Sequence, residues 1–143
     1  MQPAEATSYE VSARIFIPRI DLTSDVTMLA LENHALKTPD TTIGGFSRAK
    51  NKTLLIGHSS SVFKNLNQLS VGDKIVYDLD GYEIIHSEII PKDEVEMNEL
   101  LKSEKVETLV LMTCAGEDLG NGDATERLII TATKTDFRLS ANL

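Results

Sequence analysis

Residues 107–134 read ETLVLMTCAGEDLGNGDATERLIITATK, in which two apolar runs flank a polar segment. The first run, over 107–114, contains four consecutive apolar residues, which is typical of a strand buried on both faces. The second, over 126–134, alternates and is rich in β-branched residues, which also predicts a strand. Residues 115–125 carry three glycines and three acids and predict a solvent-facing loop. The stretch therefore predicts two sheet strands joined by a loop.

The chain's one cysteine, Cys114, ends the first of these strands, and Arg127 opens the second. If the two strands pair antiparallel, the end of one lies beside the start of the other, so the thiol and the guanidinium meet. Alternation places Arg127 on the same face as Ile129. Two plainer interpretations stay open, because a lone cysteine is often a small buried hydrophobe and a strand-end arginine is often a solvated edge charge.

Further short strands are expected elsewhere in the chain. Residues 12–22 begin with alternating character and are bent at Pro18. Residues 52–58 form a short strand that ends at its glycine, with His58 just past the end. Residues 71–90 contain two β-rich runs on either side of Asp80-Gly81, which predicts a hairpin with its tight turn there. Roughly seven such strands favour a small mixed β-barrel or sandwich.

Helices are expected to be few and short. Apolar residues recur at near-helical intervals over 24–37, and a brief helix is expected over 59–70 behind a serine cap. A third short helix is expected over 91–105, which begins with a proline and has acidic residues in its first turn. The segment 41–51 contains two adjacent glycines and predicts a loop.

The overall composition is that of one globular domain without cross-links. With 143 residues the chain can bury a real core, and a single cysteine forms no internal disulfide. The net charge of −8 argues against nucleic acid as a partner. No stretch is long and apolar enough to span a bilayer. Residues 1–12 are polar and aperiodic, which predicts a flexible N-terminal arm or a linker remnant ahead of a domain over 13–143.

Three candidate reactive residues fall at strand ends: His58, Cys114 and Arg127. A cysteine reacts as its thiolate, which a nearby imidazole and guanidinium both favour, and the guanidinium can also donate to an oxyanion. His58 could instead simply bond to backbone, and His34 and His86 are expected at structural or surface positions. The histidines show no metal-ligand spacing, and one cysteine cannot build a structural zinc site, so no metal is expected from the pattern.

Three segments resemble the sortase family of bacterial cysteine transpeptidases: VLMTC (110–114), ERLIITATK (126–134) and LLIGHSSSVFKNLNQLSVGDKI (54–75). The family carries a Gly-His segment after a strand, a Thr-Leu-x-Thr-Cys strand and an arginine on the next strand. The likeness covers roughly 13–135, with order and spacing in place. One departure is Val110, which stands where the family's first threonine does; inside a strand, it bears on packing more than on chemistry. The resemblance implies a closed eight-stranded β-barrel with a few short helices.

The resemblance also implies a reaction and its residues. Cys114 would attack the Thr–Gly carbonyl of an LPXTG-like sorting signal and form a thioester acyl-enzyme. His58 would protonate the departing amine and deprotonate the incoming one, while Arg127 would hold the carbonyl and stabilise its oxyanion. Thr113 and Ser59 would line the substrate groove. A peptidase that only hydrolyses the signal, and a binding module with a buried cysteine, are the alternatives.

Partners and location follow from the same resemblance. The substrates would be surface proteins bearing the sorting signal, and the acceptor an amine of a peptidoglycan precursor or a pilin lysine. The enzyme would act at the extracellular face of the cytoplasmic membrane, held by an N-terminal anchor. No cofactor is expected except that some family members bind calcium, for which the acids of the loop 115–126 are candidate ligands: Glu117, Asp118 and Asp123.

Overall fold

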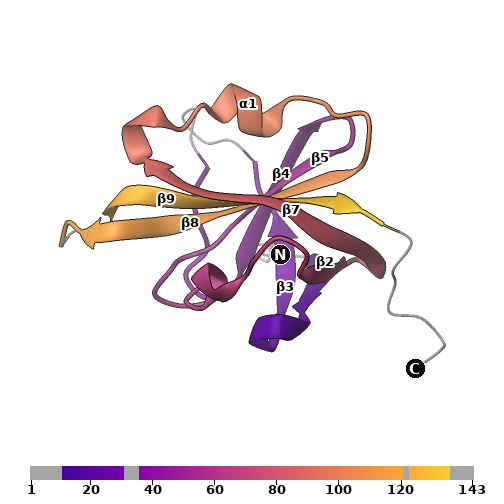
Figure 1. The fold of residues 1–143 in the computed structure, drawn as a ribbon, viewed down its shortest axis with the longest axis horizontal. Coiled ribbons are helices and arrows are strands. Elements are labelled where there is room, and N and C mark those ends of the chain that lie inside the picture. Colours follow the sequence, from indigo (N-terminus) through magenta and orange to yellow (C-terminus); the bar gives the residue numbers. More distant parts are fainter. Residues whose placement is uncertain (1–10, 31–35, 121–122, 136–143) are drawn as a thin grey trace, which may run out of the picture.

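Eight strands close into a barrel in the computed structural model, which describes residues 11–30, 36–120 and 123–135 (Figure 1). Around the barrel the order is β2-β3-β4-β5-β8-β9-β7-β6. The strands are β2 (Val11–Ile17), β3 (Leu22–Met28), β4 (Ile43–Ala49), β5 (Lys52–Ile56), β6 (Lys74–Tyr77), β7 (Asp80–Pro91), β8 (Thr108–Asp118) and β9 (Ala124–Lys134). The helices are α1 (Met97–Leu101) and the 3₁₀ turns η1 (Pro18–Ile20), η2 (Leu66–Gln68) and η3 (Lys92–Glu94). The expected closed eight-stranded barrel with a few short helices is confirmed.

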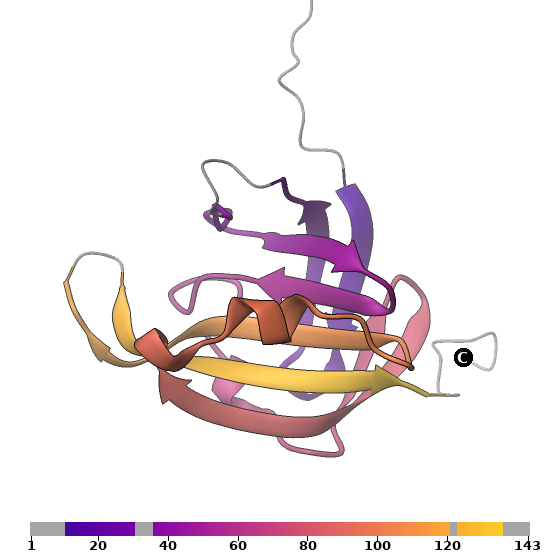
Figure 2. The same ribbon diagram turned by 90° about the horizontal axis from the view of Figure 1, so that it is seen from above.

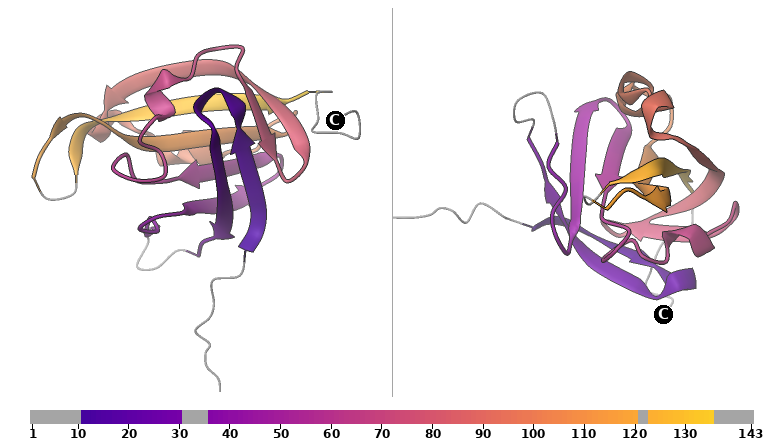
Figure 3. Two further views of the ribbon diagram at one scale, coloured as in Figure 1. Left: turned by 90° about the horizontal axis from the view of Figure 1, so that it is seen from below. Right: turned by 90° about the vertical axis from the view of Figure 1, so that its left-hand side faces the viewer.

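The apolar run of β8 is buried on both faces because two different layers cover it. Leu109 and Leu111 point into the barrel and join the main core. Val110 points outward, into a second cluster that includes Leu101 of α1. Helix α1 packs against β4 and β5 and lies outside the barrel wall, as the views from above and from the side show (Figures 2 and 3). Helix α1 therefore covers part of the outer face of β5, β8 and β9.

Strand register brings the predicted reactive positions to one end of that outer face. Strands β5 and β8 run parallel, with Ile56 opposite Met112. Strands β8 and β9 run antiparallel, with Cys114 directly opposite Arg127. The pairing expected from the sequence is confirmed.

The helix expected over 24–37 is wrong for its first part, which belongs to β3. This strand pairs antiparallel with β2 and parallel with β4, so tertiary pairing on both edges outweighs a helical spacing of apolar residues. Val26 is buried in the barrel core. Residues 31–35, with His34, lie outside the described residues.

The loop expected over 41–51 is also wrong, because residues 43–49 form β4. Its two glycines serve close packing within a strand. A Cβ atom on Gly44 would lie 2.5 Å from Cδ1 of Leu29 and 2.9 Å from Cδ of Pro39. The backbone of β4 can approach this neighbouring segment only without a side chain, which is one reason for glycine inside a strand.

The β6–β7 hairpin is confirmed, but its turn lies two residues earlier than expected. Tyr77 pairs with Asp80, and Val76 pairs with Gly81, so the last two are strand residues. The turn is formed by Asp78 and Leu79, whose φ angles of 52° and 74° are both positive, as a type I′ turn requires.

The loop expected over 115–125 is largely paired. Strand β8 continues to Asp118 and β9 begins at Ala124, and these two residues are partners. A register shift separates Ala115 from Asp118, and Gly116 within it has a φ of 79°, so the extension passes through a β-bulge. The two strands therefore project as a long ribbon past the barrel (Figure 1).

The other expectations hold in part. The brief helix over 59–70 is limited to the 3₁₀ turn η2, and the helix over 91–105 is split into η3 and α1. Strand β2 ends before Pro18, which opens η1. It begins at Val11, so residues 11 and 12 of the arm expected over 1–12 belong to a strand, and residues 1–10 lie outside the described residues. No helix in the described ranges is long and apolar enough to cross a membrane.

Candidate functional site

The three predicted reactive residues continue the outer face of three adjacent strands. Side chains two residues apart share a face, so Cys114 follows Val110 and Met112 along β8. By the same rule Arg127 precedes Ile129 on β9, and His58 follows Ile56 at the end of β5. Ile56, Val110 and Ile129 all belong to the outer cluster. The reactive residues thus lie outside the barrel, where the apolar outer face runs past α1 and opens.

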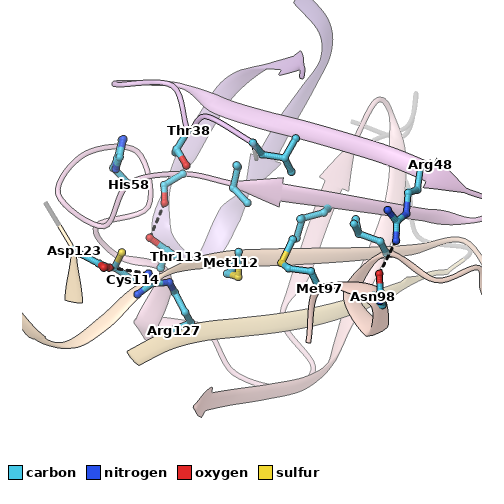
Figure 4. A pocket seen from close by; sticks show the side chains of 15 residues that line it. Thr38, Arg48, His58, Met97, Asn98, Met112, Thr113, Cys114, Asp123 and Arg127 are labelled. Atoms are coloured by element: carbon cyan, nitrogen blue, oxygen red, sulfur yellow. Dashed lines mark hydrogen bonds and ion pairs between the residues drawn. The ribbon is translucent and has the colours of Figure 1, made fainter. Parts of the chain in front are cut away.

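One cavity of about 640 Å³ collects these side chains. His58, Cys114 and Arg127 line it at one end, as Figure 4 shows. The apolar side chains that line the rest come from β5, β8, α1 and the segment before β4: Leu36, Leu54, Ile56, Met97, Leu101 and Met112. An open cavity with an apolar wall and a few convergent polar groups is the usual form of a ligand site.

His58 is held in place by the tight turn that follows it. Its carbonyl accepts hydrogen bonds from the backbone N–H of Ser61 at 3.2 Å and of Phe63 at 3.0 Å. The turn packs so closely that a Cβ atom on Gly57 would lie 2.7 Å from Cγ1 of Val62 and 2.8 Å from a ring carbon of Phe63. A glycine before His58 is therefore a packing requirement, and it fixes where the imidazole begins.

Thr113 and Ser59, the predicted groove residues, differ in placement. Thr113 lines the cavity but is buried, and its hydroxyl donates a 2.7 Å hydrogen bond to the carbonyl of Gly57. This bond ties the strand of Cys114 to the segment of His58. Ser59 is exposed and lies outside the cavity lining.

The Arg127 guanidinium is held along part of its edge and free along the rest. Nη1 donates to the carbonyls of Ala124 at 3.1 Å and Glu126 at 2.9 Å, and Nη2 donates to Oδ1 of Asp123 at 2.7 Å. A guanidinium has five N–H groups. No hydrogen bond among the described residues uses the Nε–H or the second Nη2–H. The side chain is 20% exposed. Among the described residues, these two N–H groups therefore have no acceptor, and they belong to the residue that pairs with Cys114 across the sheet.

Asp123 joins Arg127 to a second cation. Its Oδ2 lies 2.6 Å from Nζ of Lys92, while its Oδ1 binds Arg127. Hydrogen bonds from Lys92 and Arg127 hold the pKa of the Asp123 carboxyl well below its usual range. Among the described residues, no three His, Cys, Asp or Glu side chains form a group that could hold a metal ion. Asp123, named from the sequence as a calcium candidate, is instead engaged in two ion pairs.

The family model for the sortase domain matches residues 15–135. The chain belongs to the sortase family. It is therefore a sortase-type transpeptidase, and the resemblance on residues 54–75, 110–114 and 126–134 is confirmed at the level of the family. A sequence search of curated proteins returned no match.

Solved sortases of several classes share the fold. A lid mutant of sortase A from Corynebacterium diphtheriae is 19% identical, with a TM-score of 0.72 over 94% of this chain and 76% of that one. Clostridium perfringens sortase D5 is 21% identical, with a TM-score of 0.67 over 88% and 79%. Clostridium perfringens sortase C, solved with the C-terminal cell wall sorting motif, is 21% identical, with a TM-score of 0.66 over 91% and 73%. This sortase thus spans about three quarters of each.

Some residues of the sortase cavity were not recognised from the sequence. Arg48 on β4 and Asn98 on α1 both line it. The sequence predicts a loop over 41–51 and a short helix over 91–105, and no local pattern connects two positions so far apart in the chain. The ion pair of Asp123 with Arg127 was not predicted either, although the two residues are only four positions apart and Asp123 directly precedes β9. His86 is exposed on β7, with Nε2 3.6 Å from the Glu88 carboxylate.

Proposed function

We propose that this sortase cleaves an LPXTG-like sorting signal between Thr and Gly, and transfers the acyl part to an amine through a thioester on Cys114. The observation that supports the proposal is the strand pairing of Cys114 directly opposite Arg127, whose guanidinium has two N–H groups that no hydrogen bond to a described residue uses. A nucleophile next to oriented N–H donors is the arrangement that acyl transfer needs.

The first half-reaction would form the acyl-enzyme. The Cys114 thiolate attacks the threonine carbonyl carbon, and Arg127 donates hydrogen bonds to the developing oxyanion. As the C–N bond breaks, the His58 imidazolium gives its proton to the departing amine. The new C–S bond keeps the N-terminal part of the substrate on the enzyme.

The second half-reaction would release the product. An acceptor amine gives a proton to neutral His58 and attacks the thioester, and the C–S bond breaks to regenerate the thiolate. The imidazole is thereby returned to its protonated form. A peptidoglycan-precursor amine or a pilin lysine would serve as the acceptor, and surface proteins would be the substrates, at the outer face of the membrane. Thr113 would act by holding the His58 segment, and a contact of Ser59 with substrate stays a prediction.

Mass spectrometry of peptide products tests the proposal. The protein is incubated with a library of five-residue signals in longer peptides, with and without oligoglycine or a lysine peptide. We expect cleavage after threonine and a ligated product when the amine is present. Cys114→Ala should abolish both, and His58→Ala should abolish turnover while the circular dichroism spectrum is unchanged. Hydrolysis without ligation at high amine would favour a peptidase, and cleavage by Cys114→Ala would exclude the thiol mechanism.

A further inference from the structure

The cavity carries a second guanidinium at the end away from Cys114. Arg48 reaches it from β4, and Nη2 donates a 2.9 Å hydrogen bond to Oδ1 of Asn98 on α1. Figure 4 shows this pair at one end of the cavity, with Cys114, His58 and Arg127 at the other. The guanidinium is thus oriented across the cavity by a neutral partner.

The two ends of the cavity differ in charge balance. At the reactive end, Asp123 pairs with Arg127. Of the described residues that line the cavity, Asp123 is the only one with a carboxylate. The bond to Asn98 is the one hydrogen bond of the Arg48 side chain within the described ranges, and it uses one of five N–H groups. Arg48 therefore presents a positive charge and several donors that the cavity does not neutralise.

The part of a substrate that would reach Arg48 follows from the two-step reaction. The acyl part has to stay bound while the leaving group departs and an amine takes its place. A long cavity with an apolar wall therefore suits the acyl part, which extends from the cleaved bond towards the N-terminus of the signal. The leaving side needs only an open approach to Cys114.

Strand geometry indicates which residue of the acyl part would lie at Arg48. Arg48 lies in the irregular stretch of β4 between Phe46, which pairs with Leu54, and Ala49, which pairs with Lys52. It is therefore level with about Thr53 of β5, five residues before His58 (58 − 53). At about 3.3 Å per residue, this separation is roughly 17 Å. An extended peptide covers the same length in five steps. The fifth or sixth residue before the cleaved bond, just N-terminal to the leucine of an LPXTG-like signal, would lie at Arg48.

We propose that Arg48, oriented by Asn98, forms a subsite for an acidic side chain at this fifth or sixth position. A guanidinium binds a carboxylate through charge-assisted hydrogen bonds, and Arg48 offers donors for such a contact. The proposal rests on the proposed function, because the location of the acidic residue is counted from the cleaved bond. It names a substrate class: sorting signals preceded by aspartate or glutamate.

Three peptides that differ only at these positions, with Glu, Gln or Lys, test the subsite. We expect kcat/KM to fall in the order Glu, Gln, Lys, with roughly a tenfold difference between Glu and Lys at low salt that shrinks as salt is added. Arg48→Glu should reverse the order. Arg14→Glu is the matched control, since it changes the same charge on an exposed arginine of β2 outside the cavity and should leave the order unchanged.

The same ranking should hold for binding of the three peptides to the Cys114→Ala variant, measured by fluorescence anisotropy. Equal affinities there, or an Arg48→Glu variant that keeps the wild-type order, would overturn the subsite. If the wild type cleaves none of the peptides while Cys114→Ala still binds them in the expected order, the reaction proposal fails and the subsite stands.

Discussion

Two cations on the outer side of the barrel, Lys52 and Arg127, show how differently one kind of group can be used. The Lys52 side chain is 5% exposed, and its ammonium donates to Oε2 of Glu104 at 2.6 Å and to the carbonyls of Glu99 and Lys102, each at 3.4 Å. These contacts match its three N–H groups. Arg127 has three such bonds for five N–H groups. The saturated cation fastens α1 to the barrel, whereas the other retains donors for a substrate.

Replacing Arg127 should give the largest effect and should affect activity rather than the fold. Arg127→Ala removes both remaining donors, and we expect kcat/KM for a cleaved peptide to fall about a thousandfold. Arg127→Lys keeps a charge for Asp123 but loses the planar donor pair, so it should recover little. Steady-state kinetics and thermal melts measure the two effects. A variant that unfolds, or that retains most of its activity, would contradict the contrast with Lys52.

Replacing Lys52 should give the opposite result. Lys52→Met leaves the Glu104 carboxylate and two carbonyls near α1 without their buried partner, and we expect a loss of about 2 kcal/mol in the free energy of unfolding. Urea denaturation measures it. Lys74→Met is the control, because Lys74 forms an equally short ion pair with Glu83 but is 42% exposed, and its loss should cost at most ~0.5 kcal/mol. Equal losses of stability in the two variants would mean that neither the burial of Lys52 nor the use of all three of its N–H groups contributes to the free energy of unfolding.

A smaller loss of activity is expected when the ion pair that orients the Arg127 guanidinium is removed. Asp123→Asn removes the charge that holds Nη2, so we expect roughly a tenfold fall in kcat with little change in KM, because the donors stay present but are less well oriented. Glu117→Gln, an exposed acid on the same ribbon, serves as the control. A fall in the control equal to that in Asp123→Asn would trace the effect to net charge.

The smallest expected effect is a pH dependence of stability. The folded pKa of Asp123 is lowered below its ordinary 3.8 by Lys92 and Arg127. The stabilisation from its ion pairs is therefore fully present above pH 3.8, and is lost as pH falls through the folded pKa. We expect the difference in unfolding free energy between wild type and Asp123→Asn to be constant from pH 8 to about pH 5 and to shrink below about pH 4. A difference that falls to zero near neutral pH would show that a group other than Asp123 controls the stability contributed by its ion pairs with Lys92 and Arg127.

The sequence was most informative where local pattern and register coincide. The apolar run before Cys114 and the alternation from Arg127 predicted correctly that the two residues lie opposite each other on paired strands. Their placement at strand ends was wrong, because β8 continues to Asp118 and β9 begins at Ala124. The Gly-His segment follows the end of the third strand, β5. The sequence was least informative where a distant contact decides the structure. Gly44 stands inside a strand that pairs with β3 and β5, and it must be a glycine because Leu29 and Pro39 leave no room for a side chain. The hydrogen bond between Arg48 and Asn98 exists only once α1 packs on β4.

The most direct measurement of the central claim is the intact mass of the protein mixed with a sorting-signal peptide in the absence of acceptor amine. A transient gain equal to the peptide up to its threonine, mapped to Cys114 and discharged by oligoglycine, is the result that the proposed roles of Cys114, His58 and Arg127 predict. Peptide cleavage with no such adduct, or with the adduct on another residue, would contradict it.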